Sequence, residues 1–147
     1  MTVTIASIDT KVASILLLTV LLCVAALAQS PQKPEQLAQA SSDAWLAIVD
    51  AGNYGNSWDE AAQLFKSAVT KDQWLSALGQ VRTPLGKVLS RKLKSATYTK
   101  TLPNAPQGEY VVIQYDTSFE NKPGAVETVT PMLEKDGKWR VSGYFIK

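Results

Sequence analysis

Few side chains in this 147-residue sequence could do acid or base chemistry, because it has no histidine and one cysteine. The Ser-His-Asp and Cys-His catalytic arrangements are therefore excluded, and so are the usual zinc sites. The glycine-containing stretch 52–55 lacks the lysine and the spacing of a phosphate-binding loop. The composition predicts neither a metal nor another cofactor.

One acid/base arrangement remains, a carboxylate beside tyrosines. Asp116 follows Tyr115, and Tyr98 and Tyr144 would lie near them if their strands are neighbours. A carboxylate in an apolar cavity can move a proton while tyrosine hydroxyls stabilise an enolate. Alternatively, Asp116 lies on a polar strand face and pairs with a cross-strand Lys or Arg. An inward Asp116 would favour a small lyase or isomerase, and an outward one a binding protein.

Three helices are expected before any strand. The first begins at Pro34, repeats apolar residues at helical spacing and ends near Gly52. Ser57 opens a capping box that predicts a short second helix. Thr70 opens another, for a third helix that stops at residues 83–86.

After the helices the apolar period changes to two, which is typical of strands. Residues 87–102 and 109–119 are predicted strands, and the Asp-Gly pair at 136–137 predicts a tight turn within a closing hairpin over 124–147. Both faces of the final strand carry apolar side chains, which predicts a central, covered strand. The resulting fold class is α+β, with three N-terminal helices packed on a curved antiparallel four-stranded sheet.

The charges are unevenly spread, although the formal net charge is only +2. Aromatic residues are sparse in the basic stretch, residues 82–100, so nucleic acid is not expected as a partner. A solvated edge strand is expected there instead, because lysines on an edge deter strand pairing. Glu127 and Arg140 are expected to form a cross-strand pair. The stretch 73–107 has no acidic residue and contains Arg82, Lys87, Arg91, Lys92, Lys94 and Lys100.

The N-terminal residues have the pattern of an export signal. Lys11 precedes the apolar run 12–26, which is short for a membrane span, and a small-x-small cleavage site ends at Ala28. The alternative is an uncleaved N-terminal anchor. Cys23 follows a leucine rather than a small residue, so lipidation is not expected.

This pattern divides the chain into three parts. Residues 1–28 are predicted as a signal peptide, 29–33 as a linker and 34–147 as a single α+β domain. After cleavage following Ala28 the protein would be periplasmic or extracellular, with no integral membrane span.

Several stretches resemble known families. Residues 45–47, 80–86 and 110–119 look like the exported bacterial family called domain of unknown function 4019. A likeness to the cone-shaped nuclear-transport-factor-2-like superfamily is carried by residues 50–54, by Trp58 and Phe65, and by residues 136–141. At that level the fold hosts isomerases, dehydratases, hydrolases and non-enzymatic binding modules, so the resemblance implies no single activity.

We therefore expect an exported cell-envelope protein that binds an unknown small molecule or an envelope protein without catalysis. The expected ligand contacts are Tyr98, Tyr115, Asp116 and Tyr144. The alternative is a small cavity enzyme of lyase or isomerase type that uses Asp116 with these tyrosines. Related cones often dimerise through the sheet, so the resemblance also implies a homodimer.

Overall fold

The structure, a computed structural model, describes residues 32–147. The predicted signal peptide and its cleavage site lie outside this part of the chain. Among the helices within it, none has both the length and the apolar character needed to cross a membrane.

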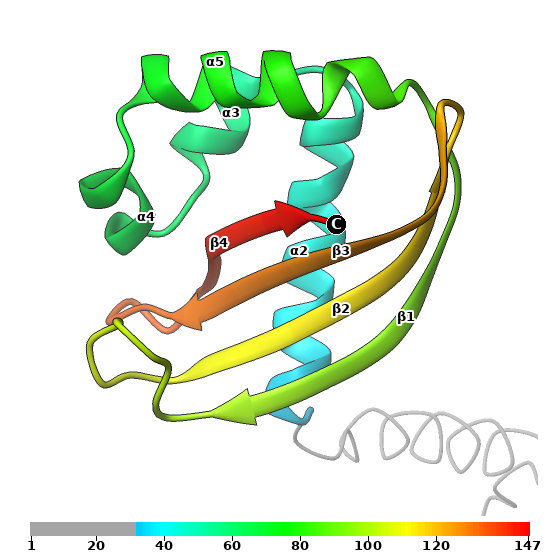
Figure 1. Cartoon of the computed structure of the whole chain (residues 1–147). Coiled ribbons are helices and arrows are strands. Elements are labelled where there is room, and N and C mark those ends of the chain that lie inside the picture. The colour runs from blue at the N-terminus through cyan, green and yellow to red at the C-terminus, as the bar shows by residue number, and fades with distance from the viewer. Residues whose placement is uncertain (1–31) are drawn as a thin grey trace, which may run out of the picture. The chain divides into compact units, whose positions relative to one another are not determined.

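The described chain has the predicted α+β order, with helices first and an antiparallel sheet after them (Figure 1). The helices are α2 (Pro34–Asp50), α3 (Tyr54–Asp59), α4 (Gln63–Ala68) and α5 (Lys71–Val81), followed by the 3-10 turn η1 (Thr83–Leu85). The strands are β1 (Val88–Thr99), β2 (Tyr110–Phe119), β3 (Lys122–Leu133) and β4 (Trp139–Ile146). They form one sheet in the order β1-β2-β3-β4.

The start and end of α2 and the start of α5 lie where the sequence predicts. Pro34 occupies the first turn of α2, and Gly52 follows its end with a φ of 76°, which glycine adopts without strain. At α5, the Thr70 hydroxyl accepts from the backbone N–H of Gln73, whose side chain accepts from the N–H of Thr70. This is the predicted capping box.

The second predicted helix is wrong in its start and its length. The chain forms two short helices, α3 and α4, so the described part has four α-helices rather than three. Ser57 lies inside α3 instead of capping it, and its buried hydroxyl donates to the carbonyl of Tyr54. A capping box in the sequence does not fix a helix start when tertiary contacts use the same hydroxyl.

Strand β4 is an edge strand, so the prediction of a central position is also wrong. Thr130 lies opposite Gly143 but Pro131 lies opposite Val141, which leaves Ser142 as an extra, bulged residue. The bulge reverses the alternation, so Tyr144 points to the same face as Val141, and Phe145 to the other face.

Helix α2 lies across one face of the sheet and contacts all four strands (Figure 1). Its Trp45 packs on Trp74 of α5, with ring centroids 6.1 Å apart, and on Tyr144 of β4, 5.3 Å away. The alternation predicted for β2 is confirmed, since Val111, Ile113, Tyr115 and Phe119 are buried on the helix side. The core therefore lies between α2, α5 and this face of the sheet.

Candidate functional site

The predicted carboxylate and its neighbouring tyrosine point away from each other. Asp116 lies on the sheet face opposite the helices, with 59% of its side chain exposed, and its Oδ1 is 3.1 Å from Nζ of Lys94 on β1. Tyr115 is buried on the helix side and donates its hydroxyl to Oδ1 of Asp43, 2.6 Å away. The two side chains thus cannot act on one substrate.

The other two tyrosines lie on the helix side of the sheet. Tyr98 is half-buried at the edge of the core, opposite Val111. Tyr144 donates its hydroxyl to Oε1 of Glu127. Burial and the adjacent carboxylates raise the pKa of both Tyr144 and Tyr115 above the ordinary tyrosine value. Both hydroxyls therefore stay protonated and act as hydrogen-bond donors to carboxylates of the protein.

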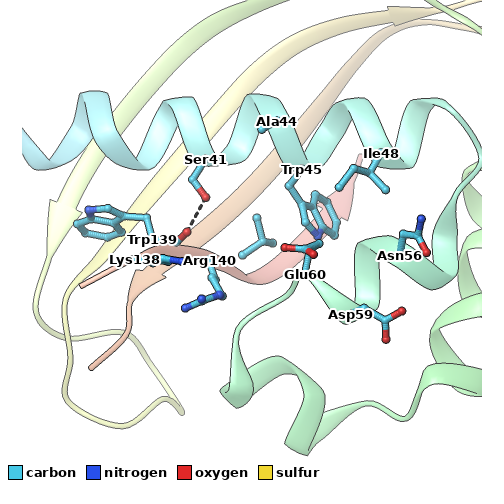
Figure 2. A pocket seen from close by; sticks show the side chains of 11 residues that line it. Ser41, Ala44, Trp45, Ile48, Asn56, Asp59, Glu60, Lys138, Trp139 and Arg140 are labelled. Carbon is cyan, nitrogen blue, oxygen red and sulfur yellow. Dashed lines mark hydrogen bonds between the residues drawn. The ribbon is translucent and has the colours of Figure 1, made fainter. Parts of the chain in front are cut away.

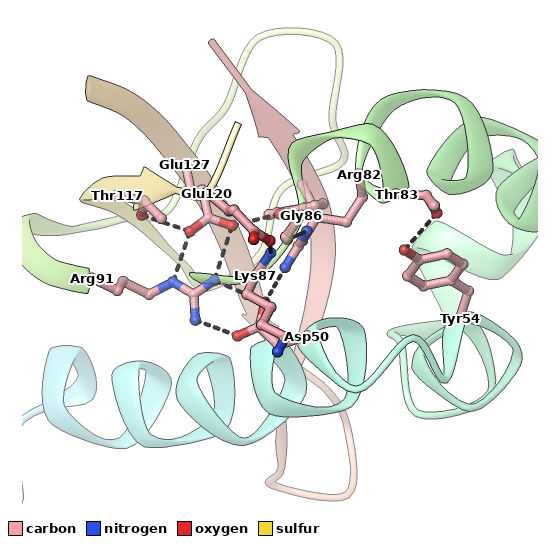
Figure 3. Close-up of polar contacts among 11 residues, drawn as sticks. Asp50, Tyr54, Arg82, Thr83, Gly86, Lys87, Arg91, Thr117, Glu120 and Glu127 are labelled. Carbon is pink, nitrogen blue, oxygen red and sulfur yellow. Dashed lines mark hydrogen bonds and ion pairs between the residues drawn. The ribbon is translucent and has the colours of Figure 1, made fainter. Parts of the chain in front are cut away.

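A charged cluster occupies the helix-facing surface of the sheet. We call it the buried polar cluster. Glu127 of β3 is fully buried at its centre, and Arg91 of β1 binds both its oxygens, with Nε 2.7 Å from Oε2 and Nη2 3.2 Å from Oε1 (Figure 3). Its members are Asp50, Arg82, Arg91, Thr117, Glu127 and Tyr144.

Both oxygens of Glu127 are saturated. Oε2 accepts from Arg91 and from the Thr117 hydroxyl at 2.6 Å, and Oε1 accepts from Arg91 and Tyr144. A carboxylate with these four donors has no free lone pair for a substrate proton. Glu127 is therefore a structural anion and not a general base.

The cluster continues to the end of α2. Asp50 accepts from Nη1 of Arg91 at 2.7 Å and from Nη2 of Arg82 at 3.1 Å. Arg82 is 4% exposed, stacks over the ring of Phe119 and donates to the carbonyl of Gly86. Burial alone would lower the pKa of Arg91, but its hydrogen bonds to Asp50 and Glu127 raise it above the ordinary value. Arg91 therefore remains charged.

Sequence reasoning missed this cluster. The expected pair of Glu127 with Arg140 is wrong, because Glu127 lies opposite Ile146 while Arg140 binds Glu134 and Asp136. The basic stretch is not wholly solvated either, since Arg82 and Arg91 turn inward. One signal was available: Glu127 alternates with Ala125 and Val129, so the pattern places a charge on the core face.

A pocket of about 600 Å³ lies on the other side of α2, between that helix, the end of α3 and the start of β4 (Figure 2). Trp139 and Trp45, which is only 3% exposed, are its aromatic lining residues, and the Ser41 hydroxyl donates to the carbonyl of Trp139. The lining residues are Ser41, Ala44, Trp45, Ile48, Asn56, Asp59, Glu60, Lys138, Trp139, Arg140 and Val141.

The pocket has charged groups of opposite sign on opposite walls. Asp59 is paired with Lys71 and Arg140 with Glu134 and Asp136. Glu60 from the α3 side and Lys138 from the β4 side form no salt bridge within residues 32–147. These two side chains are available to a ligand.

The volume and the lining of the pocket limit what it could hold. In the described part of the chain, no three His, Cys, Asp or Glu side chains gather closely enough to hold a metal ion. The volume lies within the range of small-molecule sites, about 300–1,000 Å³. Such sites are mostly apolar, whereas this pocket is lined by four charged side chains, Asp59, Glu60, Lys138 and Arg140, so a ligand that fits it must carry charged groups.

No curated protein and no solved structure matches this chain. A family profile does match, over residues 41–144, which include nearly all of the helices and strands described above. The chain belongs to the family described as "Protein of unknown function (DUF4019)".

Proposed function

We propose that this protein is a non-catalytic binding module built on a nuclear-transport-factor-2-like fold, and that its ligand occupies the pocket between α2, α3 and β4. The curved sheet with helices on one face supports this fold assignment. One observation carries the proposal: the interior carboxylate Glu127 is saturated by protein donors, whereas Glu60 and Lys138 on the pocket walls are unpaired.

The arrangement of charges defines the ligand class. A cation on the ligand would be attracted to Glu60 and an anion to Lys138, while an apolar part packs on Trp139. Small zwitterions, such as amino acids and dipeptides, carry these features in one molecule. We therefore propose a small zwitterionic ligand.

The geometry gives the enzyme alternative little support. General acid/base catalysis needs a proton-transferring group within reach of the substrate. Asp116 lies on the outer face of the sheet, and the hydroxyls of Tyr115 and Tyr144 are committed to Asp43 and Glu127.

Thermal unfolding and calorimetry with a panel of free amino acids and dipeptides test this proposal. A ligand at about 100 times its Kd adds about 2.7 kcal/mol of stability. Lys138→Glu should abolish the stabilisation because it reverses one charge of the pocket. Lys100→Glu is the matched control, since Lys100 is also exposed but does not line this pocket. If the panel gives no stabilisation, or if both variants behave alike, the pocket is not the site.

The location is part of the proposal. The apolar run 12–26 and the small residues up to Ala28 support export with cleavage after Ala28. Intact mass of protein recovered outside the cytoplasm should correspond to a chain that starts at Gln29. A full-length product that only detergent extracts would contradict export by this route.

A homodimer through the sheet is the remaining part. The face of the sheet opposite the helices carries Val112, Val126 and Thr128, each partly exposed, which supports a contact between two copies there. Light scattering measures the oligomeric state of the wild type and of Val126→Lys. We expect the wild type to be a dimer and the variant a monomer. A monomeric wild type would contradict the proposed dimer.

A further inference from the structure

The two edges of the sheet are protected differently. Edge strand β1 carries Lys92 and Lys94, and its pairing with β2 shifts register twice, after Val88 and after Leu93. Lysines and bulges both prevent an edge from pairing with another strand. At the other edge, the last residues of β4 have no charge before Lys147.

The register fixes where the backbone groups of β4 point. Val126 and Lys147 exchange both hydrogen bonds, at 3.1 and 2.9 Å, so this is a hydrogen-bonded pair of the antiparallel ladder. Alternate pairs in such a ladder are not hydrogen-bonded to each other. Ile146 and Tyr144, opposite Glu127 and Val129, therefore direct their N–H and C=O groups away from β3.

Hydrogen-bond donors from the helical part of the chain reach only the first half of this edge. The Trp139 carbonyl accepts from the Ser41 hydroxyl at 2.7 Å, and the Val141 carbonyl accepts from the N–H of Ala62 at 2.8 Å. Within residues 32–147, the outward backbone groups of Tyr144 and Ile146 have no such partner. A backbone that needs partners can obtain them from an added strand.

An apolar groove of about 260 Å³ runs beside this free half-edge, between α5 and β4. Val81 and Phe145 on its sides are 52% and 50% exposed, which is high for large apolar side chains. The groove has no charged lining residue and is formed by Trp74, Ala77, Leu78, Val81, Tyr144, Phe145 and Ile146.

We propose that an extended segment of another protein binds here as an additional antiparallel strand on β4. Its backbone would pair with Tyr144 and Ile146, and its alternate side chains, uncharged like the lining, would enter the groove. An acidic residue at its N-terminal end would lie beside Lys147, the cation at the open end of the edge. This site is separate from the ligand pocket, and the proposal does not depend on it.

Charge complementarity favours this occupant over a second copy of the chain. The segment Trp139–Ile146 contains no acidic residue, so a second β4 paired on this edge would offer no carboxylate to Lys147. A peptide from another protein can provide both the apolar alternation and the acid.

The probe is an acetylated peptide of about seven residues, a glutamate followed by alternating valine and threonine. We expect amide exchange at Tyr144 and Ile146 to be fast in the free protein and to slow when the probe binds. Ile146→Pro removes one outward N–H, which an edge strand tolerates, and Val81→Lys places a charge in the groove. Each should weaken binding at least about tenfold.

Leu89→Lys is the matched control, because Leu89 is 67% exposed on β1, far from the groove lining, and its variant should bind the probe like wild type. Three results would overturn the proposal: no binding of the probe at about 1 mM, binding that Ile146→Pro and Val81→Lys leave unchanged, or a homodimer that Val81→Lys converts to a monomer. The last would assign the edge to a second copy.

Discussion

The guanidinium of Arg91 on β1 binds the carboxylate of Glu127 on β3 across the intervening strand β2, although 36 positions separate them in the sequence. Thr117 of β2 lies opposite Arg91 and donates to the same carboxylate, so one acid connects three strands. Arg91 also binds Asp50, which attaches the end of α2 to the sheet. The buried polar cluster therefore fixes the position of α2 on the sheet.

Removing Arg91 should be strongly destabilising. Arg91→Met leaves the charged carboxylate of Glu127 buried, with only the hydroxyls of Thr117 and Tyr144 as hydrogen-bond donors. Breaking a buried ion pair in this way costs about 3–5 kcal/mol. Lys94→Met breaks the exposed pair with Asp116 and should cost less than about 1 kcal/mol. Urea unfolding measures both. Equal midpoints for the two variants would contradict a structural role for the cluster.

The protein should lose stability in alkaline solution through Tyr115 and Tyr144. Their pKa values are raised in the folded state, so both stay protonated while an unfolded tyrosine releases its proton above about pH 10. The stability they contribute is complete below that pH and falls above it by about 1.4 kcal/mol per pH unit for each tyrosine. Tyr115→Phe should reduce this slope in urea unfolding between about pH 9 and 11. An unchanged slope would show that Tyr115 ionises normally in the folded protein.

Ser57 contributes more than a helix cap would. Its hydroxyl accepts from Nε1 of Trp74 at 2.9 Å, and its carbonyl accepts from Nε1 of Trp45 at 2.7 Å. Ser57→Ala leaves the buried indole N–H of Trp74 without an acceptor, which should cost about 1–3 kcal/mol. Ser67→Ala, at an exposed serine, should stay within about 0.5 kcal/mol of wild type by thermal unfolding. A neutral Ser57→Ala would mean that water replaces the hydroxyl.

Gly86 should tolerate alanine less well than Gly52. Both have positive φ, 75° and 76°, which strains alanine by about 1–3 kcal/mol, and Gly86 combines it with a ψ of −155°, a conformation that essentially only glycine adopts. A Cβ on Gly86 would also lie 2.7 Å from Oε2 of Glu120, whereas one on Gly52 meets no atom within 4 Å. The crowding should add about 1–3 kcal/mol to Gly86→Ala in chemical denaturation. Equal costs would show that Glu120 moves aside freely.

The sequence predicts the ends of α2 and α5 correctly because their signals are local. Pro34, Gly52 and the Thr70 capping box act within one turn of the residues they affect. The start of α3 was not predictable in the same way, because the hydroxyl of Ser57 bonds to an indole 17 positions away.

The position of β4 depends on its partners, which a single strand's pattern does not reveal. Apolar residues on both faces suggested a central strand, but the bulge at Ser142 turns Tyr144 into the core and Phe145 outward at an edge. The buried polar cluster shows the same limit. The alternation around Glu127 indicates a charge facing the core, but identifying Arg91 as its partner requires the pairing of three strands.

Asp116→Asn is the decisive variant for catalysis against binding. The carboxylate is mostly exposed and its pair with Lys94 is solvated, so the substitution should change stability by less than about 1 kcal/mol. It should also leave ligand-induced thermal stabilisation unchanged, because Asp116 does not line the pocket that holds Glu60 and Lys138. Lys138→Glu, measured alongside, should remove that stabilisation. If Asp116→Asn instead stays folded and loses a measurable turnover, the protein is an enzyme that uses the outer face of its sheet, and the binding proposal fails.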